Sequence, residues 1–330
     1  MGCVQSSVDA EALDNISTSK EVKMLLLGTG ESGKILYENH IDGDTAWFKE
    51  IIVSNVNTSM RNILQALPGL GLTILPESMV HVGTLYYPGS LYELSQDTAI
   101  AVRQLWADPA VKEAVRLSHQ FYLIDSAPYF FDSIDRISKP NYVPTLEDAL
   151  RIQVTTTGIN KTTFHTGDVI YNVFDVGGQR SERKKWRHCF EDVSVVLLFI
   201  SLSEYDQTLY EDTSTNRLKE SLHLADSIIN SRWFVNSHIV LLLNKIDLFA
   251  QKLSYSPLSN YFPDYTGGDN YDLACDYIVH RFRSLDTRPS QGRQIHTHFL
   301  MSTDTQRVQE ILSTIQEMVL KNDVGNMALL

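Results

Sequence analysis

The residues best suited to chemistry follow a short apolar run near the start of the chain. They fit G-x-x-x-x-G-K, the spacing of a loop whose backbone N–H groups surround a nucleotide phosphate. The predicted phosphate contacts are Gly28, Thr29, Gly30, Glu31, Ser32, Gly33 and Lys34. Lys34 would reach the terminal phosphates. Such a loop normally continues with a Ser or Thr that binds Mg²⁺, but the next residue here is Ile35.

A second glycine-rich segment follows the apolar run 169–174 and reads Asp175-Val176-Gly177-Gly178-Gln179. In phosphate-loop proteins a carboxylate at the end of such a strand holds Mg²⁺ through water, and a glycine N–H contacts the γ-phosphate. Gln179 is placed to orient an attacking water. The alternative interpretation is an ordinary glycine-rich turn.

A third polar segment, Asn244-Lys245-Ile246-Asp247, follows the apolar run 239–243. The Asp247 carboxylate can accept from N1–H and N2–H of guanine, which adenine cannot offer, and such polar pairing rejects the wrong base strongly. Asn244 can hydrogen-bond N7 or brace the loop. Farther along, Ser302 can present its backbone N–H to the guanine oxygen, or can simply cap a helix.

A threonine-rich segment, residues 155–158, supplies one more candidate ligand. The Thr156 hydroxyl can bind Mg²⁺ when a γ-phosphate is present, which would make this segment a switch. The alternative is a β-prone surface segment, because the assignment rests on position in the chain.

The elements that position these residues fall into two blocks. Residues 35–150 predict helices at 46–66, 90–106, 109–118 and 129–136, without strands. After about residue 154, predicted strands at 169–174, 195–200, 239–243 and 298–301 alternate with helices at 181–190, 216–230, 274–282 and 305–320. This alternation indicates a mostly parallel sheet with helices on both faces, and the helical block reads as an inserted domain.

Composition sets the protein class. The 330 residues are 43% hydrophobic and 21% charged, as in a soluble globular protein. The excess of 40 acidic over 28 basic residues argues against a nucleic-acid-binding surface. Three cysteines cannot form a disulfide framework, which favours a reducing compartment.

The first residues fit M-G-x-x-x-[ST], the acceptor pattern for myristate on Gly2. One acyl chain gives only reversible membrane binding, and palmitate on Cys3 would supply a second anchor. The alternative is a chance hexapeptide with an inert cysteine.

The order of GTGESGK, DSAPYFFDSIDRI, LRIQVTTTGI, DVGGQRSERKKW, NKID and STDT resembles the α subunits of heterotrimeric G proteins. The resemblance implies a lipid-anchored segment at 1–21, a Ras-like GTPase domain at 22–35 and 154–330, and an inserted helical domain at 36–153. It implies a switch that binds GTP or GDP with Mg²⁺ at the cytoplasmic face of the plasma membrane. The implied partners are a βγ dimer, a seven-helix receptor and a downstream effector.

The resemblance also assigns further site residues. Asp125 and Ser126 match the edge of the helical domain that faces the nucleotide, and Leu150 and Arg151 match the start of switch I. Gln153 stands where the family carries its catalytic arginine. An arginine there is worth about 10³–10⁵ in rate, a range known from GTPases of this class, so we expect slow hydrolysis.

The main departure from the family lies directly after Lys34. About two helical turns, including the Mg²⁺ serine, are missing, which removes roughly 11–12 Å of helix. We expect this loss to expose apolar side chains of the sheet at about 1.5–3 kcal/mol each. We hypothesise an omitted exon or an error in the gene model; an uninterrupted transcript encoding Lys34-Ile35 would reject this.

Two other functions compete with a GTPase switch. A non-catalytic pseudo-GTPase that binds βγ or a receptor is favoured by Ile35 and Gln153. An ATP-dependent phosphate-loop kinase is disfavoured by Asp247, which selects guanine.

Overall fold

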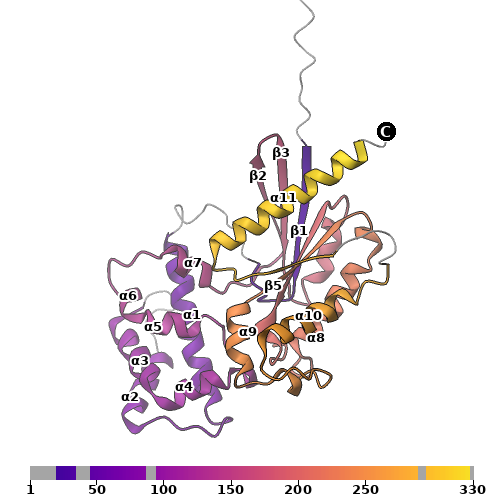
Figure 1. Cartoon of the computed structure of the whole chain (residues 1–330). Helices are drawn as coiled ribbons and strands as arrows, with labels where there is room; N and C mark the ends of the chain where they lie inside the picture. Colours follow the sequence, from indigo (N-terminus) through magenta and orange to yellow (C-terminus); the bar gives the residue numbers. More distant parts are fainter. Residues whose placement is uncertain (1–19, 35–44, 87–93, 289–294, 328–330) are drawn as a thin grey trace, which may run out of the picture.

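Figure 1 shows the computed structural model, which describes residues 20–34, 45–86, 94–288 and 295–327. A six-stranded sheet with its helices forms one part, and a cluster of helices packs beside it. The strand order is β2-β3-β1-β4-β5-β6. The parallel strands are β1 (Lys20–Gly28), β3 (Val169–Val176), β4 (Val195–Ser201), β5 (His238–Asn244) and β6 (Ile295–Phe299). The mostly parallel α/β fold predicted from the sequence is confirmed.

The central strands are apolar on both faces because helices cover both. Leu25 and Leu27 of β1 point to the face covered by α8 (Arg217–Ile229), α9 (Ile246–Leu253) and α10 (Tyr271–Arg283). Met24 and Leu26 point to the other face, which α11 (Thr305–Met327) crosses. Figure 1 shows α11 in yellow in front of the sheet.

The expectation that a lost helix would leave this second face exposed is wrong for the described residues. Met24, Leu26 and Val173 are only 1–2% exposed. Ile311 and Ile315 of α11 belong to the same apolar cluster, so α11 supplies part of the cover.

Several predicted boundaries need correction. The last strand is Ile295–Phe299 rather than 298–301, and residues 181–190 contain a 3₁₀ helix, Arg183–Cys189. The sequence did not reveal β2 (Ile159–Thr166), which pairs antiparallel with β3. As an edge strand with a mostly exposed, polar sequence, β2 lacks the apolar run that marks the others.

The helical part has its own core. Its helices are α1 (Thr45–Ala66), α2 (Pro76–Tyr86), α3 (Gln96–Ala107), α4 (Pro109–Arg116), α5 (Ala127–Asp132), α6 (Ile134–Ile137) and α7 (Leu146–Arg151). Buried side chains of α1, α3 and α5, among them Met60, Leu105 and Phe130, form one apolar cluster. The predicted helix 129–136 is split in two, and α2, α7 and α9 were not predicted.

Two sequence features cannot be compared with the structure. The lipidation residues Gly2 and Cys3, and Ile35 after the phosphate loop, lie outside the described residues. Among the described helices, none combines the length and apolar character that a bilayer crossing requires.

Candidate functional site

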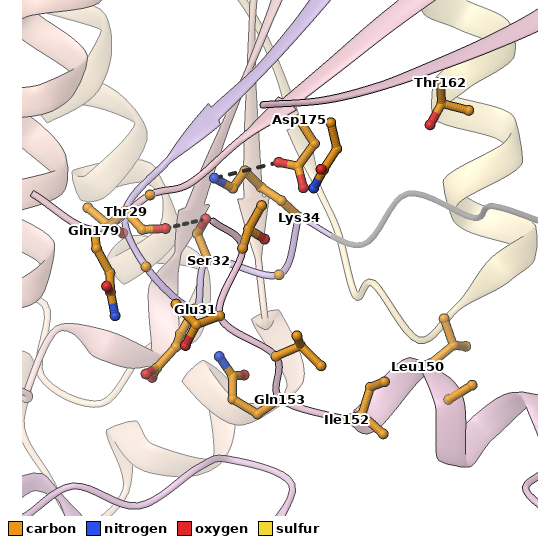
Figure 2. Close-up of a pocket in the computed structure, with 18 of the residues that line it drawn as sticks. Thr29, Glu31, Ser32, Lys34, Leu150, Ile152, Gln153, Thr162, Asp175 and Gln179 are labelled. Atoms are coloured by element: carbon orange, nitrogen blue, oxygen red, sulfur yellow. Dashed lines mark hydrogen bonds and ion pairs between the residues drawn. The ribbon is translucent and has the colours of Figure 1, made fainter. Parts of the chain in front are cut away.

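The loop that follows β1 has a tightly fixed backbone. Glu31 and Gly33 have positive φ angles of 64° and 82°. A Cβ atom on Gly33 would lie 2.2 Å from the Asn244 Nδ2 atom, so a larger residue is excluded. The Ser32 hydroxyl donates to the Thr29 carbonyl at 3.0 Å, as the dashed line in Figure 2 shows. The loop is therefore held in place by its own residues and by the loop after β5.

Lys34 and Asp175 face each other at the end of this loop. The Lys34 Nζ atom donates to the Val176 carbonyl at 2.6 Å and lies 3.8 Å from the Asp175 Oδ1 atom. Burial lowers the pKa of the Lys34 ammonium, while the Asp175 charge works against that shift. Burial also raises the pKa of the Asp175 carboxyl, and Lys34 opposes this. Burial thus disfavours the charged form of both groups, and the opposite charge of the partner favours it.

A cavity of about 790 Å³ opens beside the loop. This volume is within the range of ligand pockets in proteins. Residues 29–34 form one wall, and residues from α1, the segment 149–156 and β2 form others. Of the predicted site residues outside the loop, the ones that line it are Leu150, Gln153, Thr156, Asp175, Gly178 and Gln179.

The two glutamines predicted to act in hydrolysis both reach this cavity. Figure 2 shows Gln153 and Gln179 on either side of Glu31. The backbone at Gln153 is clamped by Asn55 of α1, which accepts from its N–H at 2.7 Å and donates to its carbonyl at 3.1 Å. A Cβ on Gly178 would lie 2.5 Å from the Thr29 carbonyl oxygen, so the loop before Gln179 needs glycine there.

The predicted base-binding residues do not line this cavity, and two of them, Asn244 and Ser302, contact the loop. Asn244 donates to the Ser32 carbonyl at 3.0 Å and accepts from the Ser302 N–H at 3.0 Å. Of its two possible roles, the structure therefore shows the bracing one. Asp247 lies in the first turn of α9, after Lys245, whose φ angle is 61°. Ile246 begins that helix.

The remaining predicted residues contact other groups. Arg151 pairs with Glu147 at 3.1 Å, and its guanidinium lies over the Tyr129 ring, so it does not line the cavity. Ser126 precedes α5 without a side-chain cap. The Gly177 carbonyl accepts from the Trp186 indole N–H at 2.8 Å.

An ion-pair network joins the helical part to the sheet, and the sequence did not predict most of it. The Lys245 Nζ atom lies 2.6 Å from the Asp125 Oδ2 atom and 3.5 Å from the Glu204 Oε1 atom. Arg217 pairs with Glu204 at 2.9 Å and with Glu31 of the phosphate loop at 3.0 Å. Neither Arg217 nor Glu204 belongs to a recognisable motif, so no sequence signal marked them.

The residues around Asp175 fit a Mg²⁺ ion bound with phosphates. Among the described residues no cluster of three or more His, Cys, Asp or Glu could hold a metal without help. Mg²⁺ commonly uses one or two carboxylates plus phosphate oxygens and water. The Asp175 Oδ1 atom is buried and accepts no hydrogen bond from the described residues. That unsatisfied oxygen, with the Thr156 hydroxyl near the same carboxyl, suits such an ion.

Comparisons with known proteins agree on one family. A family model described as G-protein alpha subunit matches residues 4–319. A guanine nucleotide-binding protein subunit alpha of Coprinellus congregatus is 52% identical over 346 residues, covering 97% of this chain and 98% of that protein. The G-protein complex alpha subunit gpaA of Aspergillus fumigatus is 45% identical over 349 residues, covering 98% of both. Both alignments are longer than the chain, so these relatives contain residues that it lacks.

Proposed function

Because the chain belongs to the G-protein alpha subunit family, we propose that it is a GTP-binding switch that hydrolyses GTP slowly. Members of this family are GTPases that bind GTP or GDP, typically with Mg²⁺. The observation that carries the proposal is the shared cavity: the phosphate loop, Asp175 and both glutamines border one space.

Each residue has a chemical role in this proposal. The loop amides from Gly28 to Gly33 and the Lys34 ammonium bind the phosphates, while Asp175 and Thr156 hold Mg²⁺, which offsets phosphate charge when bound. Gln179 orients the attacking water. Gln153 can donate a hydrogen bond to the transferred phosphoryl group but brings no positive charge, which makes the chemical step slow.

The purine is selected next to the loop. Asp247 accepts from both guanine N–H groups, and Lys245 contacts the base. The Ser302 N–H donates to the Asn244 Oδ1 atom at 3.0 Å, so Ser302 braces the loop instead of contacting the base. Since Lys245 also pairs with Asp125, base binding and closure of the helical part share one side chain.

Equilibrium binding of a fluorescent GTP analogue, with and without Mg²⁺, tests this function. We expect saturable binding that unlabelled GTP displaces and ATP does not, and that tightens with Mg²⁺. Asp247→Asn should lose the preference for GTP while keeping the fold, because the amide cannot accept from both N–H groups. No binding of either nucleotide would refute the switch.

A second candidate, a non-catalytic scaffold, is favoured by Gln153 and by Ile35 at the metal-hydroxyl position. It predicts binding to βγ or a receptor that is independent of nucleotide. Pull-down of βγ by chain loaded with GDP or with a non-hydrolysable GTP analogue separates the two, since only a switch responds to the γ-phosphate.

We also infer partners and an anchor from the family. G-protein alpha subunits work with βγ, a receptor and an effector, and acylation of Gly2 and Cys3 would hold this chain at the cytoplasmic face of the plasma membrane. Incorporation of labelled myristate, compared with Gly2→Ala, tests the first of these anchors.

A further inference from the structure

A polar side chain on β2, that of Asn160, belongs to the lining of the cavity that also contains Asp175, the predicted Mg²⁺ ligand. In the β2–β3 pairing, Asn160 is directly opposite Asp175. Directly opposite residues of antiparallel strands point to the same face, with Cβ atoms about 4.5–5.5 Å apart. Both residues line the cavity, together with Lys34 and Thr156.

The Asn160 carboxamide is available for a ligand. Its residue is exposed, and no hydrogen bond joins its side chain to another described residue. The neighbouring Asp175 Oδ1 atom is buried and accepts no hydrogen bond from the described residues, and the Lys34 Nζ atom lies 3.8 Å from it. Two side chains that carry oxygen ligands therefore border one cavity from adjacent strands.

The chemistry of these groups suits a divalent cation. Mg²⁺ prefers oxygen ligands and takes carboxylate and carboxamide oxygens. Ile35 occupies the sequence position at which a phosphate loop normally supplies a hydroxyl oxygen, so the loop offers the ion one neutral ligand fewer. The Asn160 side chain can offer a neutral carbonyl oxygen on the side of the cavity that β2 forms.

We propose that the Asn160 Oδ1 atom is a ligand of the nucleotide-bound Mg²⁺ and replaces the absent loop hydroxyl. This rests on the proposed nucleotide binding. Asn160 then joins Thr156 as a direct protein ligand, beside Asp175, which holds the ion through water, and so replaces the oxygen that the loop does not supply.

The test measures cation affinity rather than hydrolysis. The full chain is loaded with a non-hydrolysable GTP analogue, and free Mn²⁺ is counted by electron paramagnetic resonance during titration. Asn160→Val, which suits an exposed strand, should weaken Mn²⁺ binding about tenfold. Asn160→Asp keeps an oxygen and should retain the affinity.

Thr162→Val is the matched control, because Thr162 lies on the same face of β2, borders the same cavity and is farther from the phosphate loop (Figure 2). It should leave Mn²⁺ affinity unchanged. Unchanged affinity in Asn160→Val, or an equal loss in Thr162→Val, overturns the assignment while nucleotide binding stands. If the wild-type chain takes up no nucleotide, the proposed function and this assignment both fall.

Discussion

Replacing Asp125 by asparagine tests whether the helical part retains the nucleotide through its ion pair with Lys245. The two charged atoms lie 2.6 Å apart, and the side chains are about one-fifth exposed, at 19% for Lys245 and 21% for Asp125. Burial alone would raise the pKa of Asp125 and lower that of Lys245. The opposite charge of each partner outweighs burial, so the pKa of Asp125 is lowered and the pKa of Lys245 is raised. Both groups therefore stay charged.

The size of the effect follows from the surroundings of the pair. Two unit charges about 4 Å apart attract by about 4 kcal/mol at an effective dielectric constant of 20. When the helical part moves away from the sheet, both charged groups return to water, and their hydration offsets much of this attraction. We therefore expect loss of the pair to destabilise the closed arrangement by about 1–2 kcal/mol. That corresponds to about five- to thirtyfold faster nucleotide release. Lys245 keeps Glu204 at 3.5 Å, so we expect the lower part of this range.

The assay is release of a fluorescent GDP analogue after addition of excess GDP. Asp135→Asn is the control, because Asp135 pairs with Arg103 at 3.1 Å within the helical part, where both side chains are about half exposed or more. It should leave the release rate unchanged. An unchanged rate in Asp125→Asn, in a protein that binds nucleotide normally, would refute the argument that this pair holds the site closed.

Three further predictions concern hydrolysis and stability. Gln153→Arg should speed single-turnover GTP hydrolysis by up to about 10³–10⁵, the range known for such arginines, and an unchanged rate would remove Gln153's position from the catalytic site. Asp148 is fully buried and accepts from an arginine, two tyrosines and a backbone N–H, so Asp148→Asn should cost about 3–5 kcal/mol and lower the melting temperature by at least about 6 °C in circular dichroism. Burial lowers the pKa of His238, His296 and His298 in the fold, so below pH of about 6.5 the unfolded chain binds more protons. Stability to urea should therefore fall from pH 7 to pH 5, and replacing all three by glutamine should flatten that slope.

The sequence was sufficient to predict those structural features that are determined by residues close together in the chain. The phosphate loop could be predicted because its glycines and Lys34 are contiguous and their backbone needs are set within a few residues. The buried strands could be predicted because helices cover both faces and require an unbroken apolar run, as in β4. By contrast, β2 lies at the edge with polar, exposed residues, so its strand structure depends on pairing with β3.

The sequence by itself predicted the loop after β1, the apolar runs of the parallel strands and the helical insertion, because each is marked by a pattern within a short stretch of residues. Only the tertiary structure decided which distant side chains meet. Glu31 and Arg217 are 186 residues apart along the chain, and Asp125 and Lys245 are 120 apart. The strand register that sets Asn160 against Asp175 is likewise fixed by pairing between strands. Contacts of this kind leave no pattern in a single sequence, because nothing local links one partner to the other, even where one partner belongs to a recognisable motif.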